Sequence, residues 1–70
     1  MDDKEYALMV VKHFKDGVPA EESHYECLAL GIPNKQMLRV DCMMAGFCEV
    51  VKNEKGIYPS PEETVEALFD

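Results

Sequence analysis

Residues 46–58 read GFCEVVKNEKGIY, and this stretch decides which fold the sequence predicts. Gly46 follows an amphipathic segment and is expected to end its helix. Residues 47–52 contain phenylalanine and two valines and are short for a helix, a composition that favours a β-strand. Residues 53–56, Asn-Glu-Lys-Gly, are typical of a hairpin turn whose glycine takes a positive φ, and residues 57–58 begin a return strand. The stretch therefore predicts a two-stranded β-hairpin.

A helix is predicted at the start of the chain. At 100° per residue, Ala7, Val10, Val11 and Phe14 fall within one arc, which indicates an amphipathic helix over residues 3–16. The glycine at position 17 is expected to stop this helix in the left-handed conformation.

Two further helices are predicted before the hairpin. Pro19 is expected in the first turn of a helix that runs to about residue 30 and is broken by residues 31–33, Gly-Ile-Pro. Asn34 is a predicted N-cap for a third helix over residues 35–45, whose buried face carries methionine and valine at positions 37, 40 and 44.

The strongest local signal is the Ser-Pro-Glu-Glu sequence of residues 60–63. It combines a serine N-cap, a proline at the first helical position and a glutamate that closes a capping box, so a last helix begins here. These elements predict one shared core made of Val10, Val11, Phe14, Leu28, Ile32, Met37, Val40, Met44, Phe47, Val65 and Leu68.

Length and charge restrict the class of protein. The chain has 70 residues with 14 acidic and 7 basic side chains, a net charge of −7, and is expected to form one domain over residues 1–70. No uncharged stretch approaches the roughly 20 residues of a membrane helix. The acidic start and the odd number of cysteines, 3, favour a reducing compartment and predict a cytoplasmic protein.

The order helix, helix, tight turn, helix, hairpin, helix resembles a winged helix-turn-helix, an α+β fold. Residues 27–32 and 45–48, with a Leu-Gly-Ile turn and a Gly-Phe step into the strand, are similar to small stand-alone winged helices of the YjcQ type. The chain departs from that pattern in its short third helix and in Pro59, which shortens the return strand.

The resemblance implies that the third helix reads DNA and that the hairpin wing contacts phosphates. The residues it assigns to nucleic-acid binding are Asn34, Lys35, Gln36 and Arg39 on the helix and Lys52 and Lys55 on the wing. The structural alternative is that these are ordinary solvated side chains. The first functional hypothesis is thus a regulatory, transcription-associated module that binds duplex DNA.

Net charge supports a second hypothesis. Phosphate contacts need lysine and arginine, and residues 32–58 carry only one more base than acid. The alternative function is therefore an acidic protein-interaction module or inhibitor that masks a basic, nucleic-acid-binding partner without binding DNA itself. A homodimer through Tyr6, Met9 and His13 of the first helix would double the DNA contacts. The alternative is that the terminal helix of the same chain packs on these three residues.

The sequence offers little for catalysis or metal binding. His24, Cys27, Cys42 and Cys48 are enough ligands for zinc in number, but their spacing matches no zinc module, so we expect no metal and no cofactor. Cys27 and Cys48 are expected in the core, His24 at its edge and His13 on the surface. His24 and Cys27 lie three residues apart but lack an orienting group, and we do not expect an enzyme.

Overall fold

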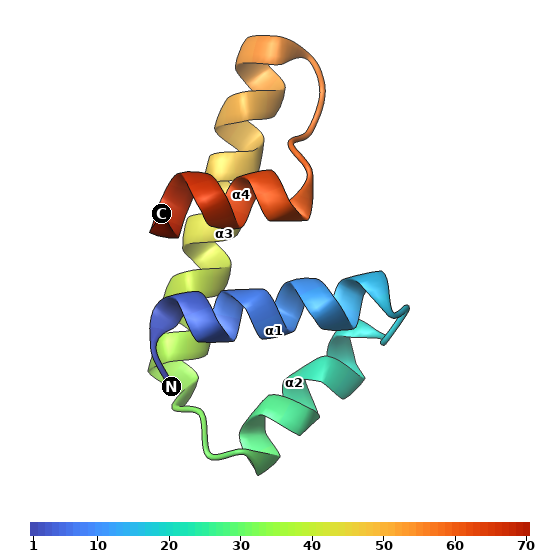
Figure 1. Ribbon diagram of the computed structural model, residues 1–70, viewed down its shortest axis with the longest axis vertical. Coiled ribbons are helices and arrows are strands. Elements are labelled where there is room, and N and C mark those ends of the chain that lie inside the picture. Colours follow the sequence, from blue (N-terminus) through green and yellow to red (C-terminus); the bar gives the residue numbers. More distant parts are fainter.

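The computed structural model describes residues 1–70 and contains four helices and no β-strand (Figure 1). The helices are α1 (Asp3–Lys15), α2 (Ala20–Ala29), α3 (Asn34–Lys55) and α4 (Pro61–Phe69). The predicted α+β winged helix is therefore wrong, because the hairpin wing on which it depended does not form. None of the helices has the length and apolar character needed to cross a membrane.

The segment predicted as a hairpin is the second half of α3. This helix has 22 residues and passes through Gly46 without a break. It ends at Lys55 and is capped by Gly56, which has a φ of +82° and donates its backbone N–H to the Lys52 carbonyl at 2.8 Å. The positive φ predicted for Gly56 is thus confirmed, but it closes a helix rather than a hairpin turn.

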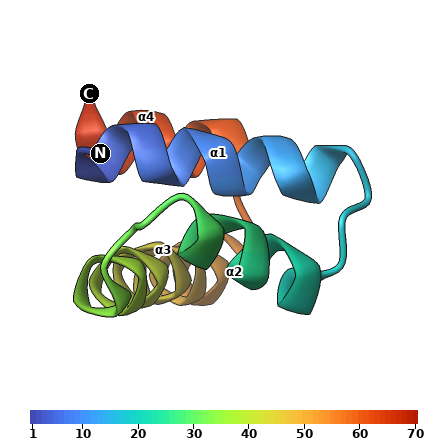
Figure 2. The same ribbon diagram turned by 90° about the horizontal axis from the view of Figure 1, so that it is seen from below.

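The four helices form two layers. The antiparallel pair α1 and α4 lies across one side of α3, and α2 shares the layer of α3 (Figures 1 and 2). Ion pairs hold both ends of the antiparallel pair: Lys4 contacts Asp70, and the Lys15 Nζ lies 3.1 Å from a carboxylate oxygen of Glu62. This packing brings the two chain termini to the same end of the molecule.

The core is small and lies where α1 crosses α3. Its eight buried apolar residues are Tyr6, Ala7, Val11, Cys27, Ile32, Met37, Val40 and Val65. Thr64 is also buried, and its hydroxyl donates to the Ser60 carbonyl at 3.0 Å. Val10, Met44, Phe47 and Leu68 of the predicted core are only half-buried.

Two predicted core residues are exposed. Phe14 retains 71% of its accessible surface and Leu28 retains 40%. Phe14 lies in the last turn of α1, at the end of the apolar arc, where no neighbouring helix covers its ring. The arc identifies the apolar face of the helix correctly, but that face extends past the elements that pack on it.

Local end signals account for most helix boundaries. The predicted capping box of α4 is confirmed, with the Glu63 N–H donating to Ser60 Oγ and the Ser60 N–H to Glu63 Oε1, each at 3.1 Å. Gly17 has the predicted positive φ, +77°. The N-cap predicted at Asn34 is wrong, because Pro33 occupies the cap and Asn34 is the first helical residue.

Candidate functional site

The six residues predicted to bind DNA do not form one surface. Asn34, Lys35, Gln36 and Arg39 lie in the first two turns of α3, and Lys52 and Lys55 lie in its last turn. Because a helix rises about 1.5 Å per residue, Lys35 and Lys52 are separated by roughly 25 Å along the axis. Without a wing, nothing folds the second group back toward the first.

Two of the four residues at the start of α3 hold the N-terminus of the chain. The Gln36 amide donates to the Met1 carbonyl at 2.6 Å and to Asp3 Oδ1 at 3.0 Å. The Arg39 guanidinium donates to the same Asp3 oxygen at 2.7 Å. The hydrogen bond from Gln36 and the pairing with Arg39 keep the pKa of Asp3 below its usual value. These side chains fasten α1 to α3.

At the other end of α3, the Lys52 side chain binds the residue that caps the helix. Its Nζ donates to the Gly56 carbonyl at 2.8 Å and lies 5.5 Å from the centroid of the Tyr58 ring. The Tyr58 hydroxyl in turn donates to a Glu49 carboxylate oxygen at 3.1 Å. Lys35, Lys52 and Lys55 form no ion pair, so three of the four predicted cations have no acidic partner.

The first helix also lacks the free flank predicted for a homodimer. Tyr6 is 3% exposed, and its hydroxyl donates to the Asp41 carboxylate at 2.9 Å. His13 is half-buried rather than a surface residue, with Nδ1 2.7 Å from Ser23 Oγ and Nε2 3.1 Å from a Glu26 oxygen. Contacts within one chain therefore cover this flank.

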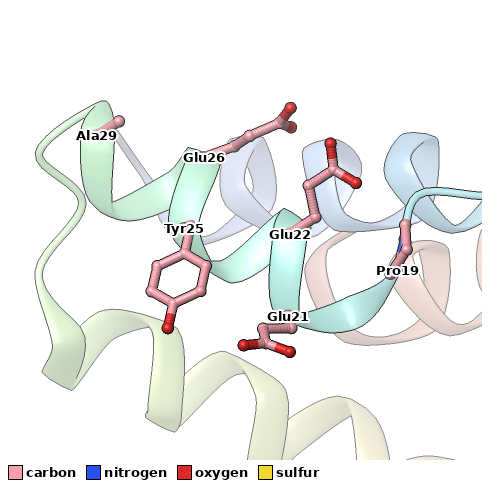
Figure 3. Close-up of a pocket in the computed structure, with 6 residues that line it drawn as sticks. All are labelled: Pro19, Glu21, Glu22, Tyr25, Glu26 and Ala29. Carbon is pink, nitrogen blue, oxygen red and sulfur yellow. The ribbon is translucent and has the colours of Figure 1, made fainter.

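The acidic side chains gather elsewhere, on α2. Residues 16–30 contain four acids and no lysine or arginine. Two rows run along the outer face of α2, each made of residues four apart: Glu21 with Tyr25, and Glu22 with Glu26. Figure 3 shows Glu21 and the Tyr25 ring on one side of α2 and the carboxylates of Glu22 and Glu26 on the other side.

This acidic face is open to solvent. Glu21, Glu22 and Tyr25 are exposed, and neither Glu21 nor Glu22 forms an ion pair. Only Glu26 has a partner, His13. Helix-dipole stabilisation explains why two glutamates suit the first turn of α2, but it does not require a tyrosine that keeps 61% of its surface in water. The combination defines the candidate interaction surface, which we call the α2 acidic face.

The cysteines and histidines do not assemble into a reactive or metal-binding cluster. No group of three or more histidine, cysteine, aspartate or glutamate side chains is placed to hold a metal ion. Cys27 is buried, and burial raises the pKa of its thiol, so it stays protonated and is a poor nucleophile. His24, predicted at the core edge, is exposed beside Tyr25, their ring centroids 6.1 Å apart.

Comparison of the chain with protein-family models, curated proteins and solved structures finds no match. The class of the protein is therefore defined by its own geometry, a small four-helix domain with an open acidic helix face. The charge asymmetry of α2 was visible in the sequence, whereas the internal bonds of Gln36 and Arg39 were not.

Proposed function

We propose that this protein is an acidic interaction module that binds a positively charged partner protein through the α2 acidic face. The observation that carries the proposal is the exposed, unpaired state of Glu21 and Glu22 beside the exposed Tyr25 ring. Carboxylates supply charge to lysine or arginine, and a tyrosine face attracts the same cations. No cation of the chain itself competes for these two carboxylates.

The charge of the whole molecule favours the same partner. Eight of the 14 acids lie in residues 16–30 and 59–70, which contain no lysine or arginine. A net charge of −7 on a domain of 7.9 kDa attracts basic surfaces over several ångströms and repels polyanions. A basic surface that another protein uses to hold nucleic acid fits this description, and covering it would make the module an inhibitor.

Binding of duplex DNA by this chain has little geometric support. Arg39 and Gln36 would have to leave Asp3 before they could reach base edges or phosphates. Affinity for a duplex grows with the number of phosphates neutralised, and Lys35 and Lys55 stand at opposite ends of α3. We therefore prefer the interaction module to the DNA-binding hypothesis.

A titration with two labelled probes tests the proposal. The first probe is a peptide of alternating arginine and serine, and the second is a nonspecific DNA duplex, each measured by fluorescence anisotropy at low and moderate salt. We expect the peptide to bind and the duplex not to bind. Replacing both Glu21 and Glu22 by glutamine should weaken peptide binding about two- to thirtyfold, since each exposed charge pair contributes about 0.2–1 kcal/mol.

A matched variant separates the local surface from net charge. Glu54→Gln with Glu66→Gln removes the same two charges from exposed positions outside the α2 acidic face. This control should lose much less affinity for the peptide. Equal losses in both double variants, or duplex binding tighter than peptide binding, would refute the proposal.

A further inference from the structure

A serine, a histidine and a glutamate form a connected cluster where α1 packs against α2. The Ser23 hydroxyl oxygen lies 2.7 Å from Nδ1 of His13, and the other ring nitrogen, Nε2, lies 3.1 Å from a carboxylate oxygen of Glu26. His13 belongs to the last turn of α1, whereas Ser23 and Glu26 are three residues apart on α2 and so share one face of that helix. The orienting group that the pair His24 and Cys27 lacks is therefore present at His13.

The two contacts determine which nitrogen of the neutral His13 ring carries the hydrogen. A carboxylate only accepts hydrogen bonds, so the nitrogen beside Glu26, Nε2, holds the hydrogen. Nδ1 then has a free lone pair, and the Ser23 hydroxyl donates to it. In this arrangement a histidine acts as a general base toward a serine while a carboxylate holds the ring in position.

The serine and the histidine border the same hollow. It has a volume of about 130 Å³ and is lined by Val10, His13, Phe14, Val18, Ala20 and Ser23. None of these residues is an aspartate, glutamate, lysine or arginine. The His13 side chain is 17% exposed, so the protein shields most of the ring from bulk water, and Ser23 is half-buried beside it. The hollow can thus hold a small uncharged group next to the Ser23 hydroxyl.

The start of α2 provides free hydrogen-bond donors close to Ser23. The N-cap of this helix, Pro19, makes no side-chain cap, and the backbone N–H groups of residues 20–22 have no acceptor within the chain. The Ser23 N–H donates to the Pro19 carbonyl at 2.9 Å. Free N–H groups at the positive end of a helix dipole stabilise an anion that forms beside them. Ala20, the first residue of the helix, also lines the hollow.

We propose that Ser23 and His13 catalyse the hydrolysis of esters of short, apolar carboxylic acids, with Glu26 as a positioning residue. Ser23 Oγ bonds to the ester carbonyl carbon while its proton passes to His13 Nδ1, and the free N–H groups of α2 stabilise the oxyanion. The ester C–O bond then breaks, the alcohol leaves with the proton from Nδ1, and the acyl group stays on Ser23. Water attacks this acyl-serine and gives a proton to Nδ1; the bond from the acyl carbon to Oγ breaks, Oγ takes the proton, and the carboxylic acid leaves.

This activity is separate from the partner binding proposed for the α2 acidic face. The two sites share only Glu26. Ser23→Ala leaves Glu21, Glu22 and Tyr25 in place, so loss of the ester reaction and loss of peptide binding are distinguished by this one variant.

Covalent labelling tests the nucleophile without any substitution. An alkyl fluorophosphonate reacts with an activated serine hydroxyl, and the only other serine, Ser60, accepts the Glu63 N–H and has no hydrogen bond to a histidine. Peptide mass spectrometry of the treated parent protein should show the adduct on Ser23 and about a hundredfold less on Ser60, since a general base contributes about 10²–10⁴-fold. Equal labelling of the two serines, or labelling of neither, would overturn the inference.

Hydrolysis of para-nitrophenyl butyrate measures the reaction itself. Ser23→Ala and His13→Gln should each lower kcat/KM about a hundredfold. The matched control is His24→Gln, which removes an exposed imidazole outside the hollow and should leave kcat/KM unchanged. If Ser23→Ala gives the circular dichroism spectrum and the hydrolysis rate of the parent, the reaction does not use Ser23 and the inference fails.

Glu26→Gln tests the positioning role through the pH dependence of the rate. The reaction needs the neutral His13 ring, and the Glu26 carboxylate is the charged group that contacts this ring from α2. Removing the carboxylate makes the imidazolium less favourable, while Lys12, Lys15 and Asp16 on the side of α1 are unchanged. The variant should hydrolyse the ester more slowly, and the acidic limb of its pH–rate profile should move to lower pH. A profile that keeps the parent's rate and position would overturn the role of Glu26.

Discussion

Replacing Gly46 with alanine tests the continuous third helix directly. Gly46 lies in the interior of α3, does not have a positive φ, and a methyl group added to its Cα would meet no atom within 4 Å. Alanine therefore adds no steric conflict and removes the conformational freedom that makes glycine unfavourable inside a helix. The expected gain in the free energy of unfolding is about 0.8–1.0 kcal/mol. For a domain of this size that gain raises the Tm by roughly 4–8 °C.

Gly56→Ala, at the C-cap of the same helix, is the matched control. Its added methyl group also meets no atom within 4 Å, so the two substitutions differ in backbone conformation rather than in space. Gly56 has a φ of +82°, in the left-handed region where a Cβ costs about 1–2 kcal/mol. The control should therefore lower stability while Gly46→Ala raises it.

Urea denaturation followed by far-ultraviolet circular dichroism measures both changes in the free energy of unfolding, the gain expected for Gly46→Ala and the loss expected for Gly56→Ala. The hairpin prediction had Gly46 end a helix, and if it did so in the left-handed conformation, alanine there would cost about as much as it does at Gly56. A Gly46→Ala variant with a lower urea midpoint than the parent would refute the continuous α3.

The failure of the hairpin prediction has a specific physical cause. Local composition around Phe47 and Val51 favours a strand, and Gly46 is a plausible stop. The apolar positions 37, 40, 44, 47 and 51 nevertheless follow one another at alternating spacings of three and four residues, which is the pattern of a single helix. Packing of this stripe against α1 and α4 outweighs the roughly 1 kcal/mol cost of one internal glycine. This apolar stripe over residues 37–51 was the feature of the sequence that predicts α3 as one continuous helix.

Two predictions that depended only on neighbours in sequence are confirmed. The capping box of residues 60–63 and the positive φ of Gly17 involve residues no more than a few positions apart, so their chemistry can be read directly from the chain. The state of Arg39 depends instead on Asp3, 36 positions away. Spacing placed Arg39 on an exposed helix face but could not show that the start of α1 lies beside it.

The same distinction explains the candidate site. The acidic character of α2 follows from composition, because no nearby lysine or arginine neutralises it. The exposure of Phe14 depends on where α2 and α4 end relative to α1, which the apolar arc of α1 does not encode. Composition therefore carries the acidic character of α2, whereas the apolar arc did not show that Phe14 is exposed.

Three further substitutions test the contacts that hold the fold. Ser60→Ala should cost about 1 kcal/mol by removing the cap of α4, and an unchanged urea midpoint would contradict that. The pKa of Asp3 is lowered chiefly by the hydrogen bond from Gln36, so its contribution is present at neutral pH and lost as pH falls below about 4; the stability gap between parent and Asp3→Asn should close there. Tyr6→Phe should cost about 1.5 kcal/mol at pH 7, because it removes a hydrogen bond to the carboxylate of Asp41, which itself stays solvated. Burial and that hydrogen bond raise the pKa of Tyr6 above its ordinary value, so the phenol contributes fully below about pH 10 and progressively less above it. Stability measured at pH 8 and pH 11 should show the gap between parent and Tyr6→Phe narrowing, and a gap that stays constant would contradict a proton held on the buried hydroxyl.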